Sequence, residues 1–305
     1  METTNEFRSG FVTIVGRPNV GKSTLLNNIL KQKIASISPR PQTTRRKQLG
    51  IFTDEKVQIV FVDTPGIHTP VHKLGEYMNQ VAEDTLRDAD LILWLVDATV
   101  PPQEEDSLVA QFALRVQTTE KVILILNKTD LVDPATLQKR KLEYETLMDC
   151  SSIHMISAQS GKGVKDLIAE LTSRLPVGFP FYDPEQVTDL YEKEIAADFI
   201  REAAMIQLKD ELPHAVAVRV DEYHDIGETN AEISATIFVE RESQKPIVIG
   251  KGGAMIKVIG ETSRKEIEKL IERKVFLELR VKALKNWRND PSALRQFGYQ
   301  HQDDK

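Results

Sequence analysis

The sequence predicts two domains: an α/β domain with a mixed, mostly parallel sheet and helices on both faces, then a smaller α+β domain. The chain has 305 residues, and a domain usually holds roughly 100 to 200. From Gly10 to about Leu175, short apolar runs alternate with segments of helical spacing, as in βαβ units. This pattern stops at Pro176–Pro184, a stretch with three prolines and a glycine. We therefore predict domains at 1–176 and 188–305, joined by a linker at 177–187.

The composition is that of an ordinary soluble globular protein. Charged residues make up 28% of the chain and the formal net charge is -6, which disfavours disordered and membrane-spanning classes. The longest apolar runs are far shorter than the roughly 20 residues that cross a bilayer. The first residues lack the basic-then-apolar pattern of a targeting signal, so we expect a cytoplasmic protein. The single cysteine, Cys150, cannot form an internal disulfide or, alone, a metal site.

Five short apolar runs in the first domain are predicted strands. Four of the five are followed directly by a motif described below, and in open α/β sheets ligands bind at the carboxyl ends of the strands. The runs are Phe11–Val15, Val57–Val62, Leu91–Val96, Val122–Leu126 and Ile153–Ile156.

The second domain combines helical and β-rich segments. The predicted elements are a helix from near 188 to 208, strands at 215–222 and 232–240, a basic helix from about 254 to 274, and a strand near 275–281.

The segment Gly16–Ser23 reads GRPNVGKS and fits G-x-x-x-x-G-K-[ST] between a predicted strand and a predicted helix. Its glycines let the backbone wrap around phosphate oxygens with N–H groups pointing inward, at a helix N-terminus whose dipole favours anions. Lys22 is predicted to reach the β- and γ-phosphates and Ser23 to bind Mg²⁺. The strand and helix on either side disfavour a chance match. The predicted phosphate-binding residues are Gly16, Asn19, Val20, Gly21, Lys22, Ser23 and Thr24.

A second motif, Asp63–Gly66, follows the second run about 40 residues later. The Asp63 carboxylate is predicted to reach Mg²⁺ through water, and the Gly66 N–H to contact the γ-phosphate. Between the two motifs a threonine hydroxyl is expected to complete the Mg²⁺ shell when the γ-phosphate is present. Thr44 is favoured over Thr43, and the choice between them stays open. Lys22, Asp63, Gly66 and Thr44 are the predicted catalytic residues.

Asn127–Asp130 reads NKTD and predicts guanine over adenine. The Asp130 carboxylate can accept two hydrogen bonds from the guanine ring N–H and exocyclic amine, whereas adenine would leave it unpaired. In isolation such a segment is more often a helix cap. Here Ser157-Ala158 follows the last run and completes the set as the loop that contacts the guanine carbonyl. Asn127, Lys128, Asp130, Ser157 and Ala158 are therefore predicted to bind the base of GTP or GDP.

Ile67 occupies the position where Ras-like enzymes carry a glutamine that orients water. An aliphatic side chain cannot position a nucleophile, so we expect slow intrinsic GTP hydrolysis. Asn19 lies where some GTPases of this kind bind K⁺, and K⁺ activation is a hypothesis for this chain.

In the second domain, Ile249–Gly253 contains a G-x-x-G loop that enters the basic helix. In KH domains this loop holds the backbone of about four single-stranded nucleotides. Residues 251–290 carry eleven Lys or Arg against six Asp or Glu, a local basic surface that suits RNA. The alternative is an ordinary turn before a helix. The predicted RNA-binding residues are Ile249, Gly250, Lys251, Gly252, Gly253 and Lys257.

These motifs, together with Gln42–Arg45 and the tail residues Trp287–Asp290 and Phe297–Tyr299, resemble the Era family of bacterial GTPases over nearly the whole chain. The resemblance implies a P-loop GTPase domain followed by a type II KH domain. It implies binding near the 3′ end of 16S rRNA, a role in maturation of the 30S subunit, and GTP-controlled binding and release. It also implies loose association with the inner face of the membrane. We expect a monomer.

Two other functions compete with this interpretation. The second domain could dock protein or membrane partners, which would make the chain a signalling or cell-cycle switch. A metabolic kinase is the third alternative, and Asp130 argues against it because a carboxylate there does not suit ATP.

Overall fold

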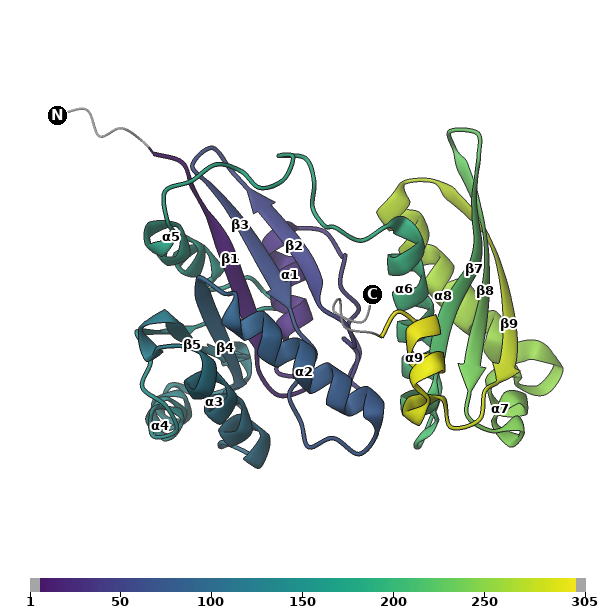
Figure 1. Ribbon diagram of the computed structural model, residues 1–305, viewed down its shortest axis with the longest axis horizontal. Coiled ribbons are helices and arrows are strands. Elements are labelled where there is room, and N and C mark those ends of the chain that lie inside the picture. Colours follow the sequence, from purple (N-terminus) through teal and green to yellow (C-terminus); the bar gives the residue numbers. More distant parts are fainter. Residues whose placement is uncertain (1–5, 300–305) are drawn as a thin grey trace. The chain divides into compact units, whose positions relative to one another are not determined.

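The computed structural model describes residues 6–299, and the outermost ends of the two predicted domains lie outside this range. Residue contacts divide the chain into two compact units (Figure 1). The first comprises the chain up to Lys33, Thr44–Thr69 and Met78–Asp189. The second comprises Ile34–Thr43, Pro70–Tyr77 and the chain from Leu190 onward.

A six-stranded sheet in the order β2-β3-β1-β4-β5-β6 forms the centre of the first unit. All neighbouring strands are parallel except β2, which runs antiparallel to β3. The strands are β1 (Arg8–Val15), β2 (Gln48–Thr53), β3 (Val57–Asp63), β4 (Leu91–Asp97), β5 (Val122–Asn127) and β6 (Ser152–Met155). The helices between successive strands are α1 (Lys22–Leu30), α2 (Lys73–Arg87), α3 (Glu104–Val116) and α4 (Pro134–Glu145), and α5 (Val164–Arg174) follows β6.

The central strands β3, β4 and β5 are buried along their whole length. Parallel strands covered on both faces read as continuous apolar runs, and for this reason the sequence locates them well. The edge strand β2 is not among the predicted runs. It carries Gln48 and Gly50, and a side chain at Gly50 would collide with Leu26 of α1. The position of β2 in the sheet depends on its contacts with α1 and β3, and the residues of β2 alone do not predict these contacts.

The predicted linker, residues 177–187, lies against the sheet of the first unit. Gln58 on β3 is completely buried. Its Oε1 accepts hydrogen bonds from the backbone N–H groups of Phe181 (2.6 Å) and Tyr182 (2.9 Å), and its Nε2 donates to the Tyr182 carbonyl (2.9 Å). Further along, the Ile51 N–H on β2 donates to the Val187 carbonyl at 2.9 Å. The segment therefore belongs to the first unit, which extends to Asp189.

The second unit contains a three-stranded sheet in the order β7-β8-β9, with β7 antiparallel and β9 parallel to β8. Apolar residues of α6, α8 and the sheet form its core. Its elements are α6 (Glu192–Gln207), β7 (Ala217–Ile226), β8 (Asn230–Val239), α7 (Lys245–Ile249), α8 (Ala254–Ile271), β9 (Lys274–Ala283) and α9 (Pro291–Gln296).

The predicted elements of this unit are present with shifted ends. The helix expected from 188 begins at Glu192, where the Glu194 carboxylate accepts a hydrogen bond from the Tyr191 N–H at 3.0 Å. The basic helix ends at Ile271, because Glu272 adopts a left-handed backbone with φ of 55°. Within residues 6–299, none of the helices is both long enough and apolar enough to cross a membrane.

Candidate functional site

The predicted phosphate loop joins β1 to α1, and its glycines are required by the local backbone. Gly21 has φ of 105° and directly precedes α1, and a side chain there would collide with the Asn127 amide. Asn19 is exposed with φ of 64°, while Val20 is completely buried. The loop thus anchors itself through Val20 and presents its backbone at the N-terminus of α1, an arrangement suited to an anion.

Lys22 begins α1 and is buried under this loop. Its Nζ donates to the carbonyls of Gly16 and Arg17, both at 3.0 Å. Burial lowers the pKa of Lys22 to about 8, although the nearby Asp63 carboxylate opposes this shift. An ammonium held by two neutral carbonyls gains a strong partner when a phosphate enters, because an anion favours its charged form.

Three oxygen-bearing side chains from separate segments meet beside Lys22. Ser23 Oγ donates to Asp63 Oδ2 at 2.7 Å, Thr44 Oγ1 donates to the same oxygen at 3.3 Å, and the two hydroxyls are 3.1 Å apart. Thr43 points elsewhere, since its Oγ1 donates to the Arg40 carbonyl at 2.9 Å. The structure therefore brings Thr44, rather than Thr43, to this corner.

The donor set at this corner fits Mg²⁺. Asp63 is completely buried, and its Oδ1 has no hydrogen-bond partner among the described residues. Burial raises the pKa of Asp63 despite the neighbouring Lys22. A buried carboxylate oxygen without a partner is costly, and a hard cation that prefers oxygen ligands removes that cost. Ser23, Thr44 and Asp63 would hold the ion, which would neutralise phosphate charge when bound.

The second motif lies directly against the phosphate loop. A Cβ on Gly66 would stand 2.8 Å from the Pro18 nitrogen, so only glycine allows this approach. Thr64 fixes the strand end by donating from Oγ1 to the Ile14 carbonyl at 2.9 Å. Ile67 is completely buried in the core that contains Val15. Its side chain therefore points into the fold and cannot reach a water molecule at the phosphate.

Asn127 connects three of the predicted nucleotide segments. Its Nδ2 donates to the Val20 carbonyl at 2.7 Å, and its Oδ1 accepts from the Ala158 N–H at 2.8 Å. Asp130 is exposed in the short 3-10 helix Thr129–Leu131 next to it, and Ser157 is buried. The segments predicted to hold the base are thus fastened to the segment predicted to hold the phosphates.

A separate surface in the second unit surrounds the predicted G-x-x-G loop, which lies between α7 and α8. Gly250, Gly252 and Gly253 have φ of 75°, 61° and 82°. A Cβ on Gly250 would stand 2.6 Å from the Met255 nitrogen, whereas Gly252 and Gly253 face open space. Lys251 is exposed. The loop can therefore bring its backbone close to a ligand.

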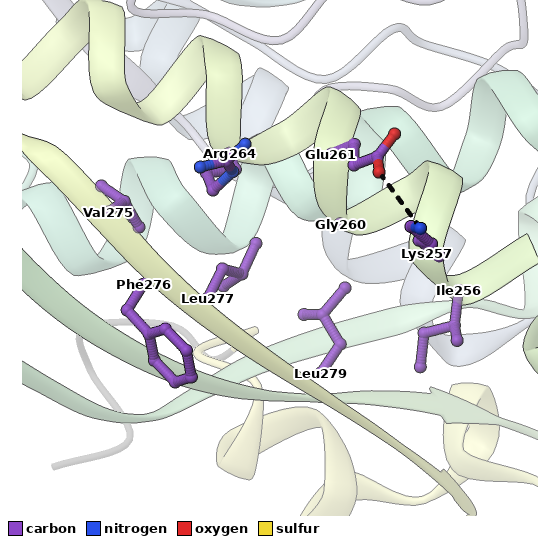
Figure 2. Close-up of a pocket in the computed structure, with 9 residues that line it drawn as sticks. All are labelled: Ile256, Lys257, Gly260, Glu261, Arg264, Val275, Phe276, Leu277 and Leu279. Carbon is purple, nitrogen blue, oxygen red and sulfur yellow. Dashed lines mark ion pairs between the residues drawn. The ribbon is translucent and has the colours of Figure 1, made fainter. Parts of the chain in front are cut away.

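A groove of about 440 Å³ lies between α8 and β9. One wall carries charge, with Lys257 paired to Glu261 at 4.0 Å, and the other is apolar (Figure 2). Gly260 leaves the space between the walls open, because a Cβ there would just contact Leu279 at 3.4 Å. The lining residues are Ile256, Lys257, Gly260, Glu261, Arg264, Val275, Phe276, Leu277 and Leu279.

Comparisons with known proteins match each of the two domains to a family. The 50S ribosome-binding GTPase family matches residues 11–128, and the KH domain family matches residues 211–288. A crystal structure of Era in complex with MgGDPNP and nucleotides 1506–1542 of 16S ribosomal RNA is 38% identical. It covers 97% of this chain and 100% of its own, with a TM-score of 0.91. The chain belongs to the Era family. A variant of Aquifex aeolicus Era bound to GDP·AlF4⁻ matches at 37% identity, with the same coverage and TM-score.

Membership of the Era family confirms the predicted fold class and the predicted GTPase activity. The chain has a P-loop GTPase domain with a mostly parallel sheet, followed by a KH domain. The residue assignments and domain boundaries remain predictions, with the positions described above as their structural basis.

Proposed function

We propose that this protein is a GTP-hydrolysing switch that binds single-stranded RNA near the 3′ end of 16S rRNA and assists 30S subunit maturation. One observation carries the proposal: a GTPase domain occurs in one chain with a KH domain that has an exposed G-x-x-G loop and a groove between α8 and β9. The Era protein that this chain matches over 97% of its length was solved with both a GTP analogue and 16S rRNA nucleotides.

In the GTPase domain, each residue group has a separate role. Lys22 and the phosphate-loop N–H groups bind the phosphates, Ser23 and Thr44 hold Mg²⁺, and Asp63 reaches the ion through water. The exposed Asp130 receives the guanine base, while Asn127 fixes the loops on which the base and phosphates rest.

The burial of Ile67 supports slow intrinsic hydrolysis as part of this proposal. With no side chain at this position to orient water, we propose that K⁺ bound near Asn19 supplies positive charge at the phosphates. Hydrolysis rates in K⁺ and Na⁺ buffers test this directly. A faster rate in K⁺ that Asn19→Ala loses would support the role, and equal rates in the two buffers would remove it.

In the KH domain, the backbone of Gly250–Gly253 approaches the RNA phosphates, and Lys251 and Lys257 add positive charge. The apolar wall of the groove receives the unstacked bases. We propose that the protein acts as a cytoplasmic monomer, and family resemblance adds weak peripheral association with the inner membrane.

RNA binding to protein loaded with a GTP analogue, GDP or no nucleotide tests the switch. The test variant carries Lys251→Glu and Gly252→Asp. The control is Lys193→Glu on α6, an exposed lysine that is not among the residues lining the groove. Tight binding with the GTP analogue that only the test variant loses would support the proposal. If RNA affinity is the same in all nucleotide states, or is unchanged in the loop variant, the protein-docking alternative is favoured.

A further inference from the structure

The strand β4 is the one predicted apolar run in the first domain that no nucleotide motif follows. It lies between β1, which leads into the phosphate loop, and β5, which leads into the guanine motif. Asp97 is its last residue and stands in register with Asn127. The carboxyl end of β4 is therefore placed between the two halves of the nucleotide site.

Asp97 contacts a cation from each half. Its Oδ2 lies 2.6 Å from Nζ of Lys128, in the guanine motif, and 3.8 Å from a terminal guanidinium nitrogen of Arg17, in the phosphate loop. The side chains of Asp97, Arg17 and Lys128 are 9%, 17% and 32% exposed, so these pairs are partly buried and are screened less than fully exposed ones. One carboxylate thus contacts two loops that are predicted to bind opposite ends of the same ligand.

The surrounding contacts hold this group in one arrangement. Arg17 Nε also lies 3.3 Å from Oδ2 of the completely buried Asp106. Lys128 adopts a left-handed backbone with φ of 64°, which is unfavourable for a residue with a side chain. The ion pair with Asp97 holds the Lys128 side chain in place on this backbone. Burial raises the pKa of Asp97, but hydrogen bonds from Lys128 and Thr99 outweigh it, so the net pKa is lowered.

We propose that Asp97 is a positioning residue for guanine-nucleotide binding, which fixes Lys128 and Arg17 so that the base loop and phosphate loop hold one geometry. Asp97 acts through these two residues and touches neither the base nor the phosphates. The inference rests on the guanine-nucleotide binding of the Era family. A wild-type protein that bound no GDP would overturn that assignment separately.

The other oxygen of Asp97 allows the positioning role to be separated from a structural one. Oδ1 accepts from the Thr99 N–H at 3.0 Å and from Thr99 Oγ1 at 2.6 Å. Asp97→Asn retains an acceptor for this turn while it removes the charge that faces Lys128 and Arg17. Thr99→Val does the reverse, since it removes a bond within the turn and leaves the carboxylate.

The experiment measures GDP and GTP-analogue affinity, steady-state hydrolysis and melting temperature of the full chain. Asp97→Asn is expected to weaken the binding of both nucleotides about tenfold, through faster dissociation. A factor of this size corresponds to the loss of one charge-assisted hydrogen bond. Asp97→Asn should raise KM with little change in kcat, because the lost contact is made equally in ground and transition states. Thr99→Val should lower the melting temperature and leave affinity unchanged. Asp54→Asn, in the exposed turn between β2 and β3, is the matched control.

A double-mutant cycle completes the test. In a Lys128→Met background, adding Asp97→Asn should cost clearly less affinity than it does alone, because one of its two partners is already gone. The proposal is overturned if Asp97→Asn binds nucleotide as tightly as wild type. It is equally overturned if the losses of affinity caused by Asp97→Asn and Lys128→Met are fully additive. It is also overturned if Asp97→Asn and Thr99→Val both lose affinity in proportion to the decrease in their melting temperatures.

Discussion

The Asn127 side chain lies 2.7 Å from the Val20 carbonyl, a hydrogen bond between residues 107 positions apart in sequence. Both groups are buried, so neither can exchange its partner for water. The residue that opens the guanine motif therefore acts within the protein, as a brace for the phosphate loop. The segments predicted to bind the base and the phosphates are therefore held together by the same amide.

Asn127→Leu should destabilise the fold and weaken nucleotide binding together. The change leaves the Val20 carbonyl and the Ala158 N–H unpaired in the interior, at about 1 to 3 kcal/mol each. We expect unfolding to require about 2 to 4 kcal/mol less free energy, measured by urea denaturation without nucleotide. GDP should also stabilise the variant less than wild type. Unchanged denaturation midpoints would contradict the bracing role.

Nucleotide binding should be coupled to proton uptake by Lys22. Burial lowers the pKa of Lys22 to about 8, below its ordinary value, so the charged form of Lys22 lowers the stability of the folded protein. This loss of stability is fully present below about pH 8. It is relieved as pH rises from there toward the ordinary pKa of lysine, because Lys22 then loses its proton in the folded protein. A bound phosphate favours the charged form, so binding near pH 8 should take up about half a proton.

Calorimetric titration of GDP in two buffers with different ionisation enthalpies measures this uptake. Lys22→Met should abolish it, while Lys31→Met should preserve it, because Lys31 is exposed and its Nζ lies 3.4 Å from Asn28 Oδ1 on the surface of α1. Equal heats in both buffers for the wild-type protein would rule out the coupling.

Removing the Gln58 side-chain amide should release the segment that follows α5. Gln58→Leu keeps the volume but leaves the backbone groups of Phe181 and Tyr182 without their side-chain partner. We expect the free energy of unfolding to fall by about 2 to 3 kcal/mol, unless the segment detaches locally and the rest of the fold keeps its stability. Limited proteolysis should then cut faster at 179–182. The exposed Gln80→Leu serves as control, and an unaltered cleavage pattern in Gln58→Leu would count against the anchor.

The difference between what the sequence predicts and what it misses has a physical cause. The motifs and central strands are local signals: a buried parallel strand is a continuous apolar run, and a phosphate loop needs glycines at fixed spacing. Gln58, Asp97 and β2 are different. Each owes its role to a partner far away in sequence, such as Phe181, Lys128 or Leu26. No local pattern marks a glutamine that holds a distant backbone, or an aspartate that joins two cations.

Gly260 provides a graded test of the α8–β9 groove. Glycine inside a helix costs about 1 kcal/mol relative to alanine, and a Cβ here would meet only Leu279, at an ordinary contact distance of 3.4 Å. Gly260→Ala should therefore stabilise the KH domain by about 0.5 to 1 kcal/mol and leave RNA affinity nearly unchanged.

Gly260→Leu should fill the space between Lys257 and the apolar wall of β9. It should retain the fold and weaken single-stranded RNA binding by at least about tenfold. Fluorescence anisotropy with a labelled RNA, together with thermal denaturation, measures both effects. If Gly260→Leu binds RNA as well as Gly260→Ala does, the RNA bases lie outside this groove and the G-x-x-G loop alone must account for binding.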